Sequence, residues 1–202
     1  MKETPLFEEV FLRLLRENGF WPKVIIGGAL SFIPVINIFA FGYLYRLSAR
    51  VRRSGRIEVP EWGDWAGLFK DGLRFAVVWL GFWLLPILLA GGLAYFVGSL
   101  GLRALGFLVF SFVFLLAPIL FSSALYRYTM RLDFRDLLDL ALIFRMTFSE
   151  LPRLVVPALV FAGIFAVAAP LYGLAVFFGF FVLIVHISIV FRRIEQNRKV
   201  VF

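Results

Sequence analysis

Few residues in this sequence have the types and spacing needed for chemistry. Glu61, Asp64 and Asp71 lie close together at a boundary between apolar runs, and His186 is the single histidine. Paired carboxylates can act as general acid and base, but they need a nucleophile, a metal set or another titrating group beside them. None accompanies them, and the first turn of a helix favours the negative charge of Glu61 and Asp64. We therefore predict no catalytic residue and a protein that is not an enzyme.

The sequence also predicts no metal site and no cofactor. A metal site needs several His, Cys or carboxylate ligands, whereas this chain has one His and no Cys. His186 lies in the last apolar run, where we interpret it as a neutral, hydrogen-bonded structural histidine. Asn37, near Pro34, is another polar residue inside an apolar run. Its amide could satisfy backbone groups freed by the proline, or it could line a solute path.

Composition indicates a membrane protein. Of the 202 residues, 62% are hydrophobic and the mean hydropathy is +0.93, well outside the range of soluble domains. Uncharged stretches long enough to cross a bilayer occupy 75–102, 104–126 and 154–191. We predict an all-α fold, a polytopic transmembrane helical bundle formed by residues 1–202 as a single membrane domain.

The expected elements alternate between the membrane surface and its interior. A single helix over the uncharged run 154–191, about 38 residues, would be about twice as long as the bilayer is thick. We therefore expect the chain to turn near Pro170. The helix nearest the N-terminus could lie at the interface or pack on a partner or on the protein itself. We expect interfacial elements at 4–18, 61–73 and 133–148, and spans at 75–97, 104–124, 153–169 and 172–191.

The apolar run at 22–45 has two interpretations. It is long enough for one crossing, but several glycines and a central proline, Pro34, weaken it as a straight helix. A re-entrant hairpin would place all but one of the 21 Lys and Arg residues, the exception being Arg103, on one side of the membrane. A single crossing moves the four basic residues of the N-terminal segment to the other side. The positive-inside rule favours the hairpin, and both interpretations stay open.

Basic residues indicate lipid partners. An arginine-rich stretch follows the first apolar run, and its side chains are candidates for contacts with anionic headgroups on the cytoplasmic face, or they only fix the orientation of the chain. Trp62 and Trp65 are expected anchors at headgroup depth. The juxtamembrane basic clusters lack a nucleic-acid-binding motif, so we predict no nucleic-acid partner. The candidate lipid contacts are Arg46, Arg50, Arg52, Arg53 and Arg56.

One line of sequence resembles a known family. Val59-Pro60-Glu61-Trp62-Gly63-Asp64-Trp65, continuing through Phe69-Lys70-Asp71-Gly72-Leu73 to Pro86, is similar to the bacterial and archaeal membrane proteins grouped as domain of unknown function 4013. Trp21, the Gly42-Tyr43 pair before the arginine-rich stretch and the order of apolar runs are similar too, so the resemblance covers most of the chain. It implies a multi-pass protein in the cytoplasmic membrane of a prokaryote. It implies no site residue, because the family has none assigned.

These observations favour a non-enzymatic scaffold, accessory or membrane-homeostasis protein. Its expected partners are membrane lipids, together with a second copy of the chain or another membrane protein. The main alternative is a permease or channel for a small solute, with a path through the broken run around Asn37. A lipid-modifying enzyme is the third possibility.

Overall fold

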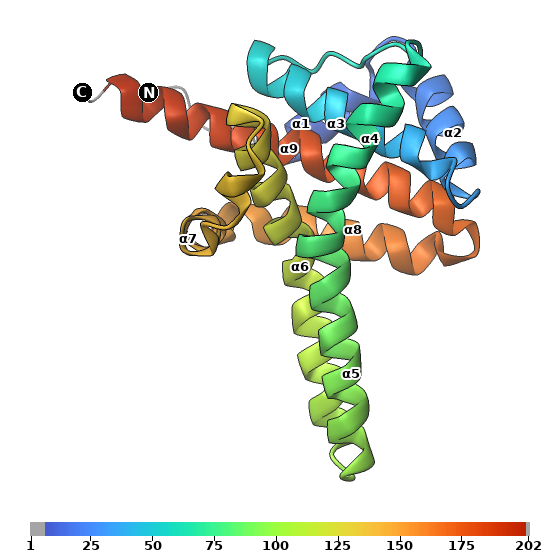
Figure 1. The fold of residues 1–202 in the computed structure, drawn as a ribbon, viewed down its shortest axis with the longest axis vertical. Helices are drawn as coiled ribbons and strands as arrows, with labels where there is room; N and C mark the ends of the chain where they lie inside the picture. Colours follow the sequence, from blue (N-terminus) through green and yellow to red (C-terminus); the bar gives the residue numbers. More distant parts are fainter. Residues whose placement is uncertain (1–6, 201–202) are drawn as a thin grey trace.

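A computed structural model describes residues 7–200, which are almost entirely helical and contain no β-strand (Figure 1). This confirms the predicted all-α fold. Within these residues, three helical segments are long and apolar enough to cross a membrane, or four if one bent pair counts as a span. In chain order the elements are α1 Phe7–Leu15, α2 Phe20–Ser31, α3 Asn37–Ser54, α4 Trp65–Trp79, η1 Leu80–Leu84, α5 Leu85–Ser99, α6 Arg103–Arg131, η2 Phe134–Leu137, α7 Leu140–Ser149, α8 Leu151–Val167, η3 Ala169–Leu171 and α9 Tyr172–Val200.

A long helical hairpin projects from the body of the molecule (Figure 1). The elements α4, η1 and α5 form one helical segment, Trp65–Ser99, and α6 returns beside it. From Trp65 onward, the expected interfacial segment at 61–73 and the expected span at 75–97 therefore belong to one continuous helical segment, with no turn between them. A five-residue π-helix, η1, ends at Leu84, two residues before Pro86. Its wider turn accommodates the proline ring, which would clash with the carbonyl four residues earlier in a regular α-helix.

The distal half of this hairpin exposes large apolar side chains. Leu89 is 65% exposed, Tyr95 83% and Phe107 70%. A contiguous apolar surface of this kind is unfavourable in water but matches the hydrocarbon interior of a bilayer. The hairpin tip at residues 100–102 is exposed as well.

The run expected at 22–45 is divided into α2 and α3 by a turn at 32–36. Pro34 lies in this turn, and Val35 adopts a left-handed conformation with φ 71°. The two ends of the run lie close together, because both contact Trp62: its indole donates to the Lys23 carbonyl at 3.3 Å, and its ring stacks on Tyr43 with centroids 4.2 Å apart. A single straight crossing would separate these ends by about 30 Å. The structure therefore has the hairpin form of this run, not the straight one.

The region after α6 differs from the expected helix at 133–148. Asp133 accepts a hydrogen bond from the Arg135 amide, and Asp139 accepts one from the Leu142 amide. These two caps divide the region into the short 3-10 helix η2 and the helix α7. The chain then bends by 87° between α7 and α8. Of the two expected final spans, only α9 is long enough to cross alone, and α8 reaches that length only together with α7.

The helix expected at 4–18 is described from residue 7 onward, as α1, and its residues 4–6 lie outside the described part. Its apolar face is turned toward the protein, because Val10 and Leu14 are buried and the helix packs against α9. This arrangement corresponds to the alternative in which the helix packs on the protein itself.

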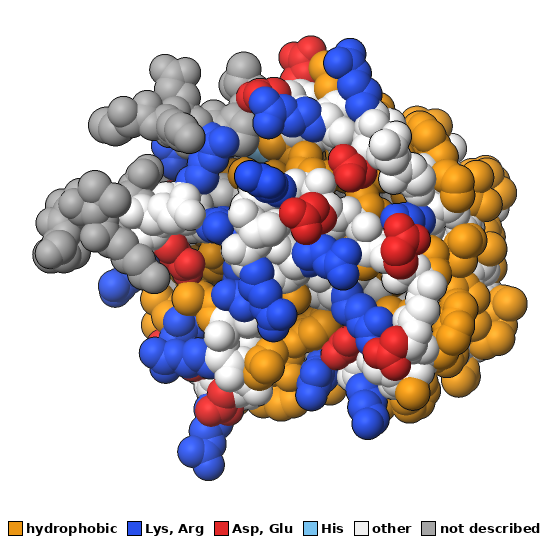
Figure 2. All heavy atoms as spheres, turned by 90° about the horizontal axis from the view of Figure 1, so that it is seen from above, with side chains coloured by type: hydrophobic (Ala, Val, Ile, Leu, Met, Phe, Trp, Pro, Cys, Tyr) orange, Lys and Arg blue, Asp and Glu red, His pale blue; other side chains and the backbone are white. Residues whose placement is uncertain are grey.

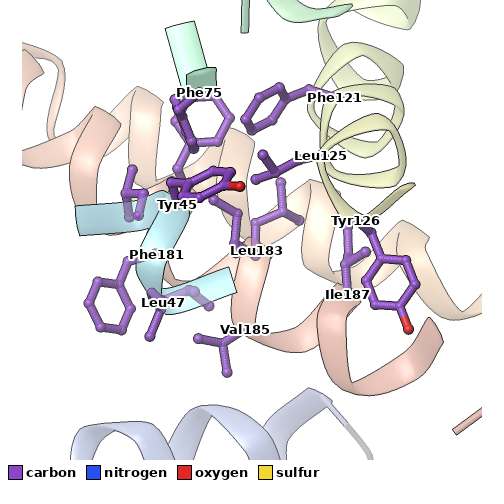
Figure 3. Packing of buried hydrophobic residues seen from close by; sticks show 14 of the residues in the cluster. Tyr45, Leu47, Phe75, Phe121, Leu125, Tyr126, Phe181, Leu183, Val185 and Ile187 are labelled. Carbon is purple, nitrogen blue, oxygen red and sulfur yellow. The ribbon is translucent and has the colours of Figure 1, made fainter. Parts of the chain in front are cut away.

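The helix α9 forms the centre of the molecule and packs against α1, α2, α3, α6 and α8. Figure 3 shows side chains from α3, α4, α6 and α9 meeting in one apolar cluster. Phe121 of α6 is fully buried, with its ring centroid 5.0 Å from that of Phe75 and 5.1 Å from that of Phe180. Phe41 of α3 packs on the same Phe75 ring, with centroids 5.0 Å apart, so aromatic packing fixes the positions of α3 and α4 relative to this core.

Candidate functional site

The close crossing of α3 and α4 positions the polar residues of both helices. A Cβ atom added to Gly42 would lie 1.9 Å from the carbonyl oxygen of Leu68, and one added to Gly72 would lie 1.9 Å from that of Ile38. The backbones therefore touch at a point where only glycine fits. One turn beyond the crossing, Arg46 of α3 faces Asp71 of α4.

Arg46 connects the start of α4 to α3. Its Nε donates to Asp71 at 2.9 Å, its Nη2 to Asp64 at 2.7 Å and its Nη1 to the Gly63 carbonyl at 3.2 Å. The hydrogen bond from the Arg46 guanidinium, with a second from the Gly67 amide, lowers the pKa of the Asp64 carboxyl. Asp64 is thus an ionised cap of α4, and both carboxylates have structural partners.

A second set of contacts fastens the preceding segment to α2 and α3. The buried Lys23 ammonium donates to Glu61 at 2.6 Å, and the Tyr43 hydroxyl donates to the Pro60 carbonyl at 2.7 Å. The Trp62 indole donates to the Lys23 carbonyl at 3.3 Å, and its ring stacks on Tyr43 with centroids 4.2 Å apart. The Pro-Glu-Trp sequence is therefore a clamp that holds this segment against the α2–α3 hairpin.

The two expected membrane anchors have different surroundings. Trp62 is partly buried within the clamp, whereas Trp65 is 50% exposed and touches Phe39 with its ring edge. Trp65 is the more accessible of the two to lipid.

An arginine-lined groove of about 340 Å³ lies between α3, α4 and the end of α6. Arg46, Arg50 and Arg53 follow one another at intervals of four and three residues and so share one face of α3. Arg74 and Asp71 line the groove from α4. Arg50 and Arg53 are exposed and form no ion pair with any described residue, so the groove carries excess positive charge.

Two of the five candidate lipid contacts lie elsewhere. Arg52 points toward α6, where its Nη2 donates to the Thr129 carbonyl at 2.7 Å, and its own carbonyl accepts from Arg192 at 2.6 Å. Arg56 lines a different groove, together with Arg13 of α1. The structure thus brings Arg46, Arg50 and Arg53 together and adds Arg74, which sequence reasoning missed. Its only local signal is its position three residues after Asp71 on the same helix.

Asn37 and His186 are not brought together. Asn37 is the first residue of α3, beside the turn whose Phe32 carbonyl accepts a hydrogen bond from Tyr172 at 2.7 Å. His186 lies fourteen residues after Tyr172 on α9, which is about 21 Å along the helix axis. It is 2% exposed, its ring meets the Phe7 ring edge-on at 5.2 Å, and its Nδ1 has no hydrogen-bond partner among the described residues. A common solute path through both residues has no geometric support.

Charged side chains gather at the end of the molecule opposite the hairpin tip. Figure 2 shows Lys and Arg spread across this face with Asp and Glu between them, and hydrophobic side chains along its right edge. Within residues 7–200, no group of three or more His, Cys, Asp or Glu side chains could hold a metal ion. The described side chains of this face therefore carry charges of both signs without a cluster of metal ligands.

Long apolar helices, lipid-compatible exposed surface and one charged end define a helical integral membrane protein. Residues 26–185 match the family described as protein of unknown function (DUF4013), and the chain belongs to this family. The match confirms the resemblance seen in the Pro-Glu-Trp line. No curated protein and no solved structure matches the chain.

Proposed function

We propose that this protein is a non-enzymatic membrane scaffold or accessory protein. The observation that supports this most strongly is the closed interior around α9. Phe177, Phe180 and Phe181 are each fully buried there, and Phe180 packs against Phe121 and Phe161 with ring centroids 5.1 and 5.0 Å apart. A solute path along the central helix would have to displace these rings. Close packing of this kind favours a structural role over transport.

The proposed orientation places the charged face at the cytoplasmic surface of a prokaryotic cell membrane. The α5–α6 hairpin then crosses the hydrocarbon and exposes its tip on the other side. The excess of arginine on the α3 face supports this placement, because Lys and Arg are retained on the cytoplasmic side. Anionic headgroups are the natural partners of that face.

The exposed apolar surface of the α5–α6 hairpin is the proposed contact for lipids, a second copy or another membrane protein. Its side chains face outward along most of the distal half, as Leu89 and Phe107 show. A scaffold needs such a surface free, whereas the charged end supplies attachment to the headgroup layer. Contact with a partner and attachment to the headgroup layer are therefore assigned to opposite ends of the molecule.

Purification in native lipid and reconstitution together test the proposal. We expect a stoichiometric membrane-protein partner or a homo-oligomer after mild extraction, and no faster efflux of a trapped neutral solute from proteoliposomes than from empty vesicles. A solute flux that Asn37→Ala abolishes, while the variant inserts normally, would contradict the scaffold proposal and favour a permease. Turnover of a lipid by the purified protein would contradict it in favour of an enzyme.

A further inference from the structure

We propose that the arginine-lined groove binds a phosphate group, with Arg50 and Arg53 of α3 as its main ligands and Arg74 of α4 on the facing wall. This inference rests on the proposed placement of the charged face among headgroups and makes it specific. It assigns the binding of anions to one groove with defined walls.

The wall of α4 is fixed by a shared carboxylate. Asp71 accepts hydrogen bonds from Arg46 at 2.9 Å and from Arg74 at 3.1 Å, and its side chain is only 17% exposed. Arg46 also binds Asp64, so its charge is already balanced by two carboxylates. Arg46 therefore positions the wall and is not the free cation of the groove.

Arg50 and Arg53 are the cations left for a ligand. They lie on the Arg46 face of α3, and neither forms an ion pair with a described residue. Guanidinium groups bind phosphate oxygens with paired, charge-assisted hydrogen bonds, which is a geometry that lysine cannot supply. Two arginines on one wall and a third, Arg74, on the other match a tetrahedral anion with several oxygens.

The size and rim of the groove fit a headgroup. Its volume of about 340 Å³ falls within the range of small-ligand sites, roughly 300–1,000 Å³. Leu132, which is 51% exposed, lies at the rim beside the end of α6 and offers apolar contact. A phospholipid headgroup and a soluble phosphate ester share the phosphate that the arginines recognise, and only the lipid adds an acyl chain.

A matched pair of double variants tests the site in the full-length purified protein. Arg50→Gln/Arg53→Gln removes two charges from the groove, whereas Arg135→Gln/Arg145→Gln removes two exposed charges from η2 and α7. Each protein is titrated in detergent with phosphatidylglycerol, phosphatidylcholine and glycerol 3-phosphate, and binding is measured by native mass spectrometry and by thermal shift. We expect the groove variant to bind phosphatidylglycerol about tenfold more weakly or worse, and the control variant to bind like the parent protein.

The three probes separate the sources of the phosphate. Binding of phosphatidylglycerol alone supports a lipid site, and binding of glycerol 3-phosphate as well supports a site for the phosphate group from either source. Equal binding of phosphatidylglycerol by the groove variant and the control would overturn the inference, as would equal binding of phosphatidylcholine and phosphatidylglycerol by the parent protein. Solute flux or lipid turnover would contradict the scaffold proposal without affecting this result, so the two failures are distinguishable.

Discussion

Replacing Gly72 by alanine tests the close crossing of α3 and α4. The added Cβ would lie 1.9 Å from the backbone carbonyl oxygen of Ile38, and contacts below 3.0 Å are essentially never seen for real Cβ atoms. Because the obstacle is backbone, the two helices must separate by about 1–1.5 Å to restore van der Waals contact. The same shift would stretch the 2.9 Å hydrogen bond between Arg46 and Asp71 beyond bonding distance.

The expected cost follows from this displacement. Overpacking of a close interface typically costs about 1–3 kcal/mol. Alanine also favours an exposed helix over glycine by up to about 1 kcal/mol, and this gain must be removed from the comparison. Gly92→Ala provides the control, because Gly92 lies in α5 of the same helical segment and an added Cβ would meet nothing within 4 Å.

The assay is thermal unfolding of the two variants in the same detergent. Each kcal/mol shifts the Tm of a chain of this size by about 2–4 °C, so Gly72→Ala should unfold about 2–12 °C below Gly92→Ala. Gly92→Ala should match or slightly exceed the parent protein. Equal Tm values for both variants would refute the close crossing, and with it the positioning of Arg46 against Asp71.

Two further predictions concern the core and the Asp64 cap of α4. Phe121→Ala should lower the free energy of unfolding by about 3–5 kcal/mol, measured by detergent-based denaturation, because the ring is fully buried between two others; Phe107→Ala, at a site 70% exposed, should cost far less, and equal costs would contradict the described core. Folding lowers the Asp64 pKa from its ordinary value of 3.8, so its stabilising contribution is complete above that pH and is lost as pH falls through the lowered value. The Tm difference between the parent protein and Asp64→Asn should therefore shrink as the medium becomes more acidic than pH 3.8, and a difference that grows would contradict the pairing with Arg46.

Helix type and the main apolar segments could be predicted because hydrophobicity, length and helical spacing are local properties. The boundaries of the individual helices were harder to predict from the sequence. The helical segment from Trp65 to Ser99 continues past the expected boundary near residue 74. Gly72 packs against the backbone of α3 instead of ending the helix, and the polar Asp71 is bonded by Arg46 of the same neighbouring helix. The caps at Asp133 and Asp139 divide the region that follows α6, whereas the apolar face shared by residues 133–148 favours a single helix there.

Part of the candidate site could be predicted because helical spacing is a local property of the sequence. Arg46, Arg50 and Arg53 share a helical face, and Arg52 lies roughly opposite in that periodicity, so the helical spacing itself could have separated it from the others. The contribution of Arg74 depends on the α3–α4 crossing, which is a tertiary contact between glycines distant in sequence. Sequence pattern alone does not specify which helices cross.

The placement of the basic face and the hairpin tip on opposite sides of a membrane is the central claim, and thiol labelling tests it most directly. The chain has no cysteine, so Asn18→Cys, Glu58→Cys and Ser99→Cys each introduce a unique, exposed probe. With a membrane-impermeant maleimide, we expect Asn18→Cys and Glu58→Cys to react only from the cytoplasmic side and Ser99→Cys only from outside. Reaction of Asn18→Cys from outside with Glu58→Cys from inside would contradict the hairpin of α2 and α3, and reaction of all three from one side would contradict the membrane-spanning role of the α5–α6 hairpin.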